Sequence, residues 1–307
     1  MPATFVHLRL HSAFSLTEST LRIGTLTKLV SGDSQPAAAI TDTNNMFGAL
    51  EFAQSMAAAG VQPIMGTQIE LEDKAGRGDV VLLAQNETGY VNLSQLLSKI
   101  LLSSDTAQTP ACAVEDLAGY SDGLILLTGG ALTGFVGGPA GDRRANLAEQ
   151  RLESLAAIVH GRLYIELQRH GLPAEVAGEP HLLEFADRMN LPLVATNDCR
   201  FEDPSMSQPL DTLVCIGTSR KISEQERQRY SSEHYFKTSS QMSELFKDIP
   251  EAIDNTLVIA KRCSVMAETR APILPAFATS AGRDEAAELR AQAQSGLQAR
   301  LERHQFS

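Results

Sequence analysis

The chain has 307 residues, of which 43% are hydrophobic and 21% charged, and its formal net charge is −11. This composition is typical of a soluble globular protein with enough apolar sequence for a large core. The acidic balance argues against a chain that grips nucleic acid by itself, because such a surface needs a surplus of Lys and Arg. The four cysteines are far apart, which predicts reduced, buried thiols, and no apolar run is long enough to span a bilayer. We therefore expect a cytoplasmic protein.

The N-terminal stretch Phe5 to His11 alternates apolar and polar residues, as a strand does. This predicts one face made of Val6, Leu8 and Leu10 and an opposite face made of His7, Arg9 and His11. The spacing of the two histidines suggests a zinc site. Arg9 lies between them, however, and a guanidinium has no lone pair to donate and repels a cation. The segment therefore contains two histidines that could bind a metal ion and an arginine that would repel it.

Strands and helices alternate along the rest of the chain. The expected strands are 37–41, 61–71, 79–84, 123–128, 163–167 and 191–196, and the expected helices are 21–30, 49–59, 89–101, 145–159, 181–189, 210–217, 239–246 and 250–262. Short apolar strands between helices favour a parallel sheet with helices outside, and about seven such units fit a closed or nearly closed barrel. We expect the glycine-rich stretch 137–141 to be a surface loop.

The texture of the sequence changes near Ala271. Residues 273–275 read as extended, 278–282 as a loop, and 284–304 as a helix rich in Ala, Glu and Arg. We therefore predict a barrel domain over 1–270 and the start of a second region over 271–307, cut within a longer protein.

Polar residues follow most of the predicted strands, and in a barrel such positions converge on one site. They are Arg9, His11, Asp42, Thr43, Gln68, Asp79, Gly130, Asp198 and Arg200, with Glu18 in the loop after the first strand. Among them His11, Asp42, Asp79 and Asp198 can ligate a metal, with Glu18 as a further candidate. One interpretation is a surviving single-metal site. The interpretation we prefer is that Arg9 and Arg200 form ion pairs with Asp198, Asp79 or Glu18, because an unpaired Arg beside a metal is costly.

Two other groups of residues carry weaker signals. His170 follows the sixth strand and fits either the rim of the barrel or a loop cap. Tyr230, Tyr235 and Phe236 lie near basic residues and could stack on bases, but packing against the barrel suits the acidic chain better.

Several blocks, taken in order, resemble a known family. They are His7-Leu8-Arg9-Leu10-His11-Ser12, Ala39-Ile40-Thr41-Asp42, Pro63-Ile64-Met65-Gly66, Asn86-Glu87-Thr88-Gly89-Tyr90-Val91-Asn92-Leu93 and Val194-Ala195-Thr196-Asn197-Asp198, followed by Tyr235-Phe236-Lys237 and Pro250-Glu251-Ala252-Ile253-Asp254-Asn255. Together they resemble the PHP (polymerase and histidinol phosphatase) domain of the alpha subunit of bacterial DNA polymerase III. The resemblance covers essentially the whole chain and implies the PHP fold, a distorted (β/α)7 TIM-like barrel, here with a C-terminal helical extension at the start of the polymerase region.

The chain departs from the metal-binding pattern of this family at most positions. The resemblance implies histidines where Arg9, Thr43, Asp79 and Arg200 stand, a carboxylate at Gln68, an aspartate at Glu18 and a cysteine at Gly130. His11 and Asp198 match the family. We interpret these nine positions as a vestigial metal site with no catalytic residue.

The resemblance therefore implies a catalytically inactive domain of a replicative DNA-directed DNA polymerase. Such a domain stabilises the polymerase and docks an epsilon-type proofreading exonuclease subunit, while DNA and Mg are bound by the full-length protein. This fragment would need no cofactor. The alternative is a metal-dependent phosphoesterase (a 3'-5' exonuclease, phosphatase or pyrophosphatase) whose single ion is held by His11, Asp79 and Asp198. A free-standing barrel hydrolase is a third and weaker hypothesis.

Overall fold

The computed structural model describes residues 5–103, 110–277, 279 and 282–304. The chain divides into two compact units, Met1–Glu268 and Thr269–Ser307. The second unit contains an extended stretch and helix α11 (Glu285–His304), close to the helix expected there. Among the described residues, none of the helices combines the length and the hydrophobicity that crossing a bilayer requires.

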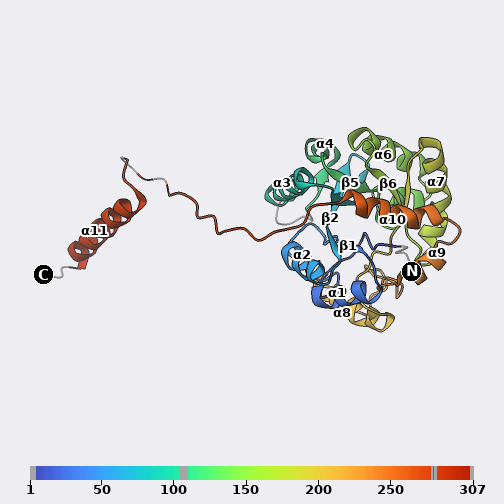
Figure 1. Ribbon diagram of the computed structural model, residues 1–307, viewed down its shortest axis with the longest axis horizontal. Coiled ribbons are helices and arrows are strands. Elements are labelled where there is room, and N and C mark those ends of the chain that lie inside the picture. Colours follow the sequence, from blue (N-terminus) through green and yellow to red (C-terminus); the bar gives the residue numbers. More distant parts are fainter. Residues whose placement is uncertain (1–4, 104–109, 278, 280–281, 305–307) are drawn as a thin grey trace. The chain divides into compact units, whose positions relative to one another are not determined.

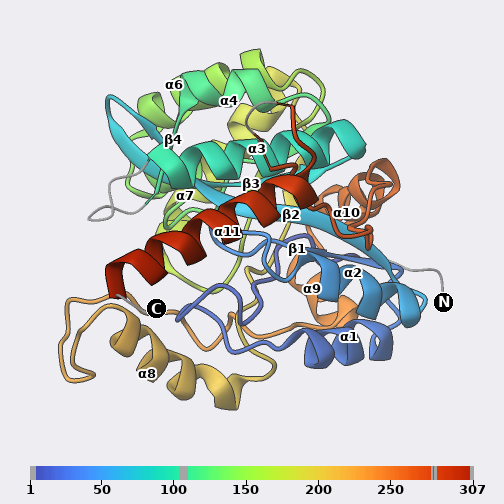
Figure 2. The ribbon, with the colours of Figure 1, turned by 90° about the vertical axis from the view of Figure 1, so that its left-hand side faces the viewer.

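Strands and helices alternate in the first unit, and the helices surround the sheet (Figure 1). The strands are β1 (Ala37–Ile40), β2 (Gln62–Asp73), β3 (Gly76–Ala84), β4 (Cys112–Ala113), β5 (Leu124–Leu127), β6 (Leu163–Leu167) and β7 (Leu193–Ala195). The longer helices are α1 (Ile23–Gly32), α2 (Ala49–Ala58), α3 (Glu87–Ser103), α6 (Ala145–Ile158), α7 (Pro173–Met189), α8 (Ser207–Gly217) and α10 (Pro250–Arg262). Shorter ones are α4 (Val114–Leu117), α5 (Gly137–Gly141) and α9 (Ser239–Leu245). Helices α3, α4, α6 and α7 lie along one flank of the barrel and α1 and α2 along another (Figures 1 and 2).

The sheet is mixed, which corrects the expectation of a parallel sheet. Its strand order is β1-β2-β3-β5-β6-β7, with the short β4 beside β2. Strand β3 runs antiparallel to both β2 and β5, while the other pairs are parallel. The reason is the tight connection between β2 and β3: a hairpin joins them and leaves no room for the crossover helix that a parallel neighbour needs.

The segment Phe5 to His11 is not a regular strand, although it pairs with both edges of the sheet as the predicted first strand would. It forms isolated bridges from His7 to Ala38 of β1 and from Leu10 to Cys199, just after β7. Ala39 N donates to His7 O and His11 N donates to Cys199 O, both at 2.9 Å. The segment thus joins the two edges of the sheet, and the sheet curls into a nearly closed, distorted α/β barrel.

Apolar strand residues fall into two clusters, as expected for a barrel wrapped in helices. The inner cluster includes Val81 and Leu83 together with Ile259 of α10, and the outer cluster includes Val80 and Leu82. The N-terminal segment departs from this alternation, because Val6 and Leu8 belong to the inner cluster and Leu10 to the outer one. The predicted single apolar face is therefore wrong. The segment changes bridging partner from β1 to Cys199 along this stretch, so a simple two-residue period does not hold.

The glycine-rich stretch 137–141 is also different from its prediction. It forms the short helix α5, most of which is buried, instead of a surface loop. A Cβ at Gly141 would lie 2.4 Å from Ala131 O, and one at Gly178 of α7 would lie 2.9 Å from Gly141 N. The small residues therefore serve close packing between α5 and α7.

Candidate functional site

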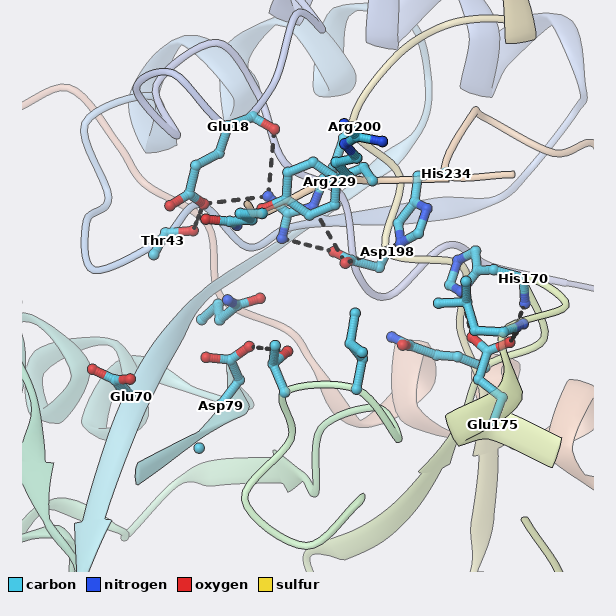
Figure 3. Close-up of a pocket in the computed structure, with 18 of the residues that line it drawn as sticks. Glu18, Thr43, Glu70, Asp79, His170, Glu175, Asp198, Arg200, Arg229 and His234 are labelled. Carbon is cyan, nitrogen blue, oxygen red and sulfur yellow. Dashed lines mark hydrogen bonds and ion pairs between the residues drawn. The ribbon is translucent and has the colours of Figure 1, made fainter. Parts of the chain in front are cut away.

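One end of the barrel holds a polar cavity of about 470 Å³, ringed by charged and polar side chains (Figure 3). Six of the predicted positions line it: Glu18, Thr43, Gln68, Asp79, Asp198 and Arg200. Arg9, His11 and Gly130 are buried behind this lining and contact its residues. The structure therefore brings all nine positions into one region.

These side chains lie on the same inward-facing side of their strands as the inner apolar cluster, one or two positions beyond it. Gln68 follows Ile64 by four residues along β2, and Glu166 follows Tyr164 by two along β6, so each keeps the inward face. Asp79 precedes Val81 by two residues on β3. Because β3 is antiparallel, its beginning lies at the same end of the barrel as the carboxyl ends of the parallel strands.

Arg9 is the centre of a buried network of ion pairs. Its Nη1 donates to both carboxylate oxygens of Glu166, at 3.0 and 3.1 Å, and its Nη2 donates to Gln68 Oε1 at 2.6 Å. Its Nε lies 3.3 Å from Asp198 Oδ1. The side chain of Arg9 is 2% exposed and that of Glu166 is fully buried. Two opposite charges removed from water in this way hold each other in place.

Arg200 forms a second centre beside the cavity. It lies 3.2 Å from Asp198 through both Nε and Nη2, and its Nη1 donates to Glu18 Oε2, also at 3.2 Å. Glu18 in turn accepts the Thr43 hydroxyl at 2.7 Å, and the Arg200 guanidinium lies over the Tyr230 ring. The ion pairs that we expected for Arg9 and Arg200 with Asp198 and Glu18 are therefore present.

His11 lies in contact with Ser15, Arg200 and Asp198. The Ser15 hydroxyl donates to Asp42, so it accepts from His11 Nδ1–H at 3.1 Å. The Nε2 atom lies 3.3 Å from Arg200 Nη2 and 3.0 Å from Asp198 Oδ1. Burial and the charge of Arg200 lower the pKa of His11. The imidazole and a carboxylate thus both lie against the same guanidinium.

The two aspartates of the site have opposite electrostatics. Burial would raise the pKa of Asp198, but Arg200 and Arg9 outweigh burial and hold it well below its usual range. Burial raises the pKa of Asp79 to about 6, because its nearest guanidinium atom, Arg9 Nη2, is 3.9 Å away. Asp79 accepts the Thr133 hydroxyl at 2.6 Å. Asp198 is therefore a firmly ionised ion-pair partner, whereas Asp79 is less well neutralised.

Asp42 does not contribute to the cavity. Its carboxylate accepts Ser12 N, the Ser12 hydroxyl and the Ser15 hydroxyl at 2.6–2.7 Å. These bonds fix the loop that follows the N-terminal segment, so the aspartate that we considered as a metal ligand has a structural role.

Glu166, the main partner of Arg9, was not predicted from the sequence. Its carboxylate also accepts hydrogen bonds from Gly129 N, Gln168 Nε2 and Thr196 Oγ1. The signal was available: Glu166 is the single charge within the apolar strand 163–167, and a buried charge needs a partner.

A stacked histidine pair was also missed, although His170 had been considered. The rings of His170 and His234 stack with centroids 3.9 Å apart, and both residues line the cavity. His170 Nδ1 lies 2.7 Å from Glu175 and its Nε2 lies 2.8 Å from Asn197 O. His170 thus lies at the rim of the barrel and also ties loops together, so both of its proposed roles apply.

The residues present do not fit a metal cluster. Within the part of the chain that the structure describes, no three His, Cys, Asp or Glu side chains converge as metal ligands. The donor atoms of His11 and Asp198 face the guanidinium of Arg200 instead, and positively charged groups at these distances oppose a cation.

Comparison with known proteins agrees with this architecture. The family model of the PHP domain matches residues 7–170, just over half of the chain. This chain belongs to the PHP domain family.

Two curated relatives that match nearly the whole chain have the same name. A DNA polymerase III subunit alpha from Caulobacter vibrioides is 44% identical and covers 97% of this chain, which spans 27% of that relative. One from Rickettsia bellii is 36% identical and covers 98% of this chain, which spans 26% of it. The solved structure of an amidohydrolase from Chromobacterium violaceum, at 14% identity and a TM-score of 0.46, covers 64% of this chain and 87% of its own. The chain thus spans about a quarter of the length of the curated relatives.

Proposed function

We propose that this chain is the PHP part of the alpha subunit of a replicative DNA polymerase and that it is itself catalytically inactive. Its function is then to stabilise the polymerase and to dock a proofreading exonuclease subunit of the epsilon type. The similarity to polymerase alpha subunits along 97–98% of the chain supports the placement in a replicase. The polymerase reaction, its Mg ions and contact with DNA belong to the full-length protein in this proposal, and the fragment itself needs no cofactor.

The observation that carries the proposed inactivity is the pair of buried arginines. Arg9 and Arg200 are 2% and 3% exposed, and their guanidinium groups are hydrogen-bonded to side chains of this chain. A hydrolase of this class needs a metal-bound water, and the two arginines stand among the donors that would hold the metal. The phosphoesterase alternative could use an arginine to bind a substrate phosphate, but that would require breaking these ion pairs.

The experiment that tests the proposal is a metal titration of the purified chain. Wild type and the double variant Arg9→His/Arg200→His are incubated with Zn, Mn or Mg and passed over a desalting column, and bound metal is measured by elemental analysis. We expect sub-stoichiometric metal in the wild type and a gain in the double variant. At least one tightly held ion per wild-type chain, together with hydrolysis of a 3' nucleotide or p-nitrophenyl phosphate, would refute the proposed inactivity.

Docking is tested separately, with the exonuclease subunit of the same replicase. We expect a one-to-one complex with the wild-type chain in analytical ultracentrifugation. A mixture that sediments as two free proteins would refute the docking role.

A further inference from the structure

The turn between the N-terminal segment and α1 contains a strained residue. Glu18 N donates to Ser15 O at 2.9 Å, which closes a four-residue turn with Leu16 and Thr17 at its centre. Thr17 has a φ of 64°, whereas Leu16 is not among the described residues with a positive φ. This combination is that of a type II turn, whose third position normally holds Gly or Asn. A β-branched residue at that position is strained, because its side chain crowds the backbone.

Both ends of this turn are fixed to the barrel, so its centre is the part that is able to change. At one end the Ser15 hydroxyl donates to Asp42 Oδ1 at 2.6 Å, and just past the other end the Ser19 hydroxyl donates to His11 O at 2.6 Å. Ser15 and Ser19 are buried, whereas Leu16 is 68% exposed. Turns of types I and II differ only in ψ of the second residue and φ of the third. Rotation of the central peptide unit therefore relieves the strain without moving either end.

A contact with α8 explains why the turn keeps its strained form. A Cβ at Gly217, the last residue of α8, would lie 2.2 Å from Thr17 Oγ1 and 2.5 Å from Thr17 Cβ. The side chain of Thr17 therefore packs directly on the backbone of Gly217. Strained residues persist where the surrounding packing fixes them, and they are frequent in switch regions. Ile216, directly before Gly217, is 70% exposed, so this end of α8 lies at the surface.

Glu18, the last residue of the turn, connects it to the candidate site (Figure 3). Its carboxylate accepts hydrogen bonds from Arg200 Nη1 at 3.2 Å and from the Thr43 hydroxyl at 2.7 Å. All three residues line the cavity. A displacement of Thr17 is passed to Glu18, because the two residues are adjacent in the chain. The contact between Thr17 and α8 is therefore linked to the ion pair of Arg200.

We propose that the turn of residues 15–18 is a conformational switch with two forms. In the form that the structure shows, Thr17 packs on Gly217 with a positive φ and Glu18 is paired with Arg200. In the other form the central peptide unit is rotated, Thr17 has a φ of about −90°, and its side chain has moved away from Gly217. Glu18 then loses its position against Arg200. The switch links a surface-exposed helix end to the ion pair beside the cavity, and it does not depend on the docking role of the chain.

The test is a set of substitutions in the full chain, followed by NMR relaxation dispersion of the backbone amides. Thr17→Gly removes the strain of the observed form, because glycine adopts a positive φ freely. Gly217→Ala places a methyl group against Thr17, and the control Gly24→Ala, in α1, meets no group of the described residues within 4 Å. We expect exchange at the amides of Leu16 and Thr17 in the wild type. The second form should be about tenfold less populated in Thr17→Gly, about tenfold more populated in Gly217→Ala, and unchanged in the control.

The double variant Thr17→Gly/Gly217→Ala gives the decisive comparison. Without the Thr17 side chain the new methyl group has nothing to displace, so we expect the double variant to match Thr17→Gly. We also expect the Arg200 Nε–H resonance to shift in Gly217→Ala and not in the double variant. Equal exchange in the wild type and Thr17→Gly overturns the switch, as does an effect of Gly217→Ala that persists in the double variant. An Arg200 resonance that is unchanged in Gly217→Ala overturns the link to the ion pair. If Gly217→Ala does not fold, a double variant that folds supports the contact with α8, and one that stays unfolded refutes it.

Discussion

Replacing Arg9 by Met is the sharpest test of the ion-pair network. The substitution keeps much of the side-chain volume but removes the positive charge. It leaves Glu166 fully buried without its guanidinium partner, and it removes the hydrogen bond to Gln68 and the ion pair to Asp198. The environment of three side chains therefore changes at once.

The expected loss follows from the cost of an uncompensated buried charge. Removing one partner of a buried pair typically destabilises a protein by about 3–5 kcal/mol. Glu166 keeps hydrogen bonds from Gly129, Thr196 and Gln168, so we expect the lower part of that range, about 3 kcal/mol. In the double variant Arg9→Met/Glu166→Gln the stranded charge is gone, and we expect a large part of the loss to be recovered.

The measurement is urea unfolding followed by far-UV circular dichroism at neutral pH. The matched control is Arg188→Met, which removes a guanidinium that pairs with Glu149 near the surface, and we expect it to cost no more than about 1 kcal/mol. If Arg9→Met costs as little as this control, or if Glu166→Gln fails to rescue it, Arg9 does not hold the network together.

The remaining predictions concern Asp79, Gly130 and Asp198. Because the folded-state pKa of Asp79 is raised to about 6, ionisation costs stability as the pH rises from about 4 to about 6, so Asp79→Asn should gain up to ~3 kcal/mol over wild type at pH 8 and little at pH 4. An equal difference at both pH values would contradict this. A Cβ at Gly130 would lie 1.9 Å from the movable end of Gln168, so Gly130→Ala should cost about 1–2 kcal/mol in thermal unfolding, and Gly134→Ala, which meets backbone at 2.3 Å, should cost more. The reverse order would refute the packing argument. Asp198→Ala removes the partner of both arginines at a left-handed residue, and we expect a loss of about 3–5 kcal/mol in urea unfolding; a normal midpoint would rule out its ion-pair role.

Much of the fold could be predicted because each element has a strong local signal. The strand 163–167 has the predicted bounds, and helix α10 was predicted residue for residue. The antiparallel strand could not be predicted from an apolar run, because an apolar strand buried on both faces shows no direction. The helix α5 was missed since its glycines suggest a loop until the close approach of α7 is known.

The prediction of Asp79 as a site residue was right, but the strand direction assumed for it was wrong. Asp79 was included among the strand-end residues on the assumption of a parallel sheet, although it begins its strand. In a parallel strand it would lie at the opposite end of the barrel, and only the reversal of β3 brings it beside Arg9. Glu166 was missed for a different reason: the resemblance directed attention to family ligand positions, whereas the partner that neutralises Arg9 comes from the middle of an apolar strand.

The two arginines have different structural roles, although both occupy positions where the family resemblance implies histidine. Arg9 pairs with a carboxylate that is fully buried, so removing Arg9 would leave a buried negative charge without its partner. Arg200 lies beside the cavity and contacts the imidazole of His11 and the carboxylates of Asp198 and Glu18. These are the kinds of donor group that a metal ion would also attract. A guanidinium is covalently attached and always charged, so this cation cannot dissociate or be chelated. The structure therefore has permanent ion pairs at the barrel end, where a guanidinium lies against the donor atoms of His11, Asp198 and Glu18.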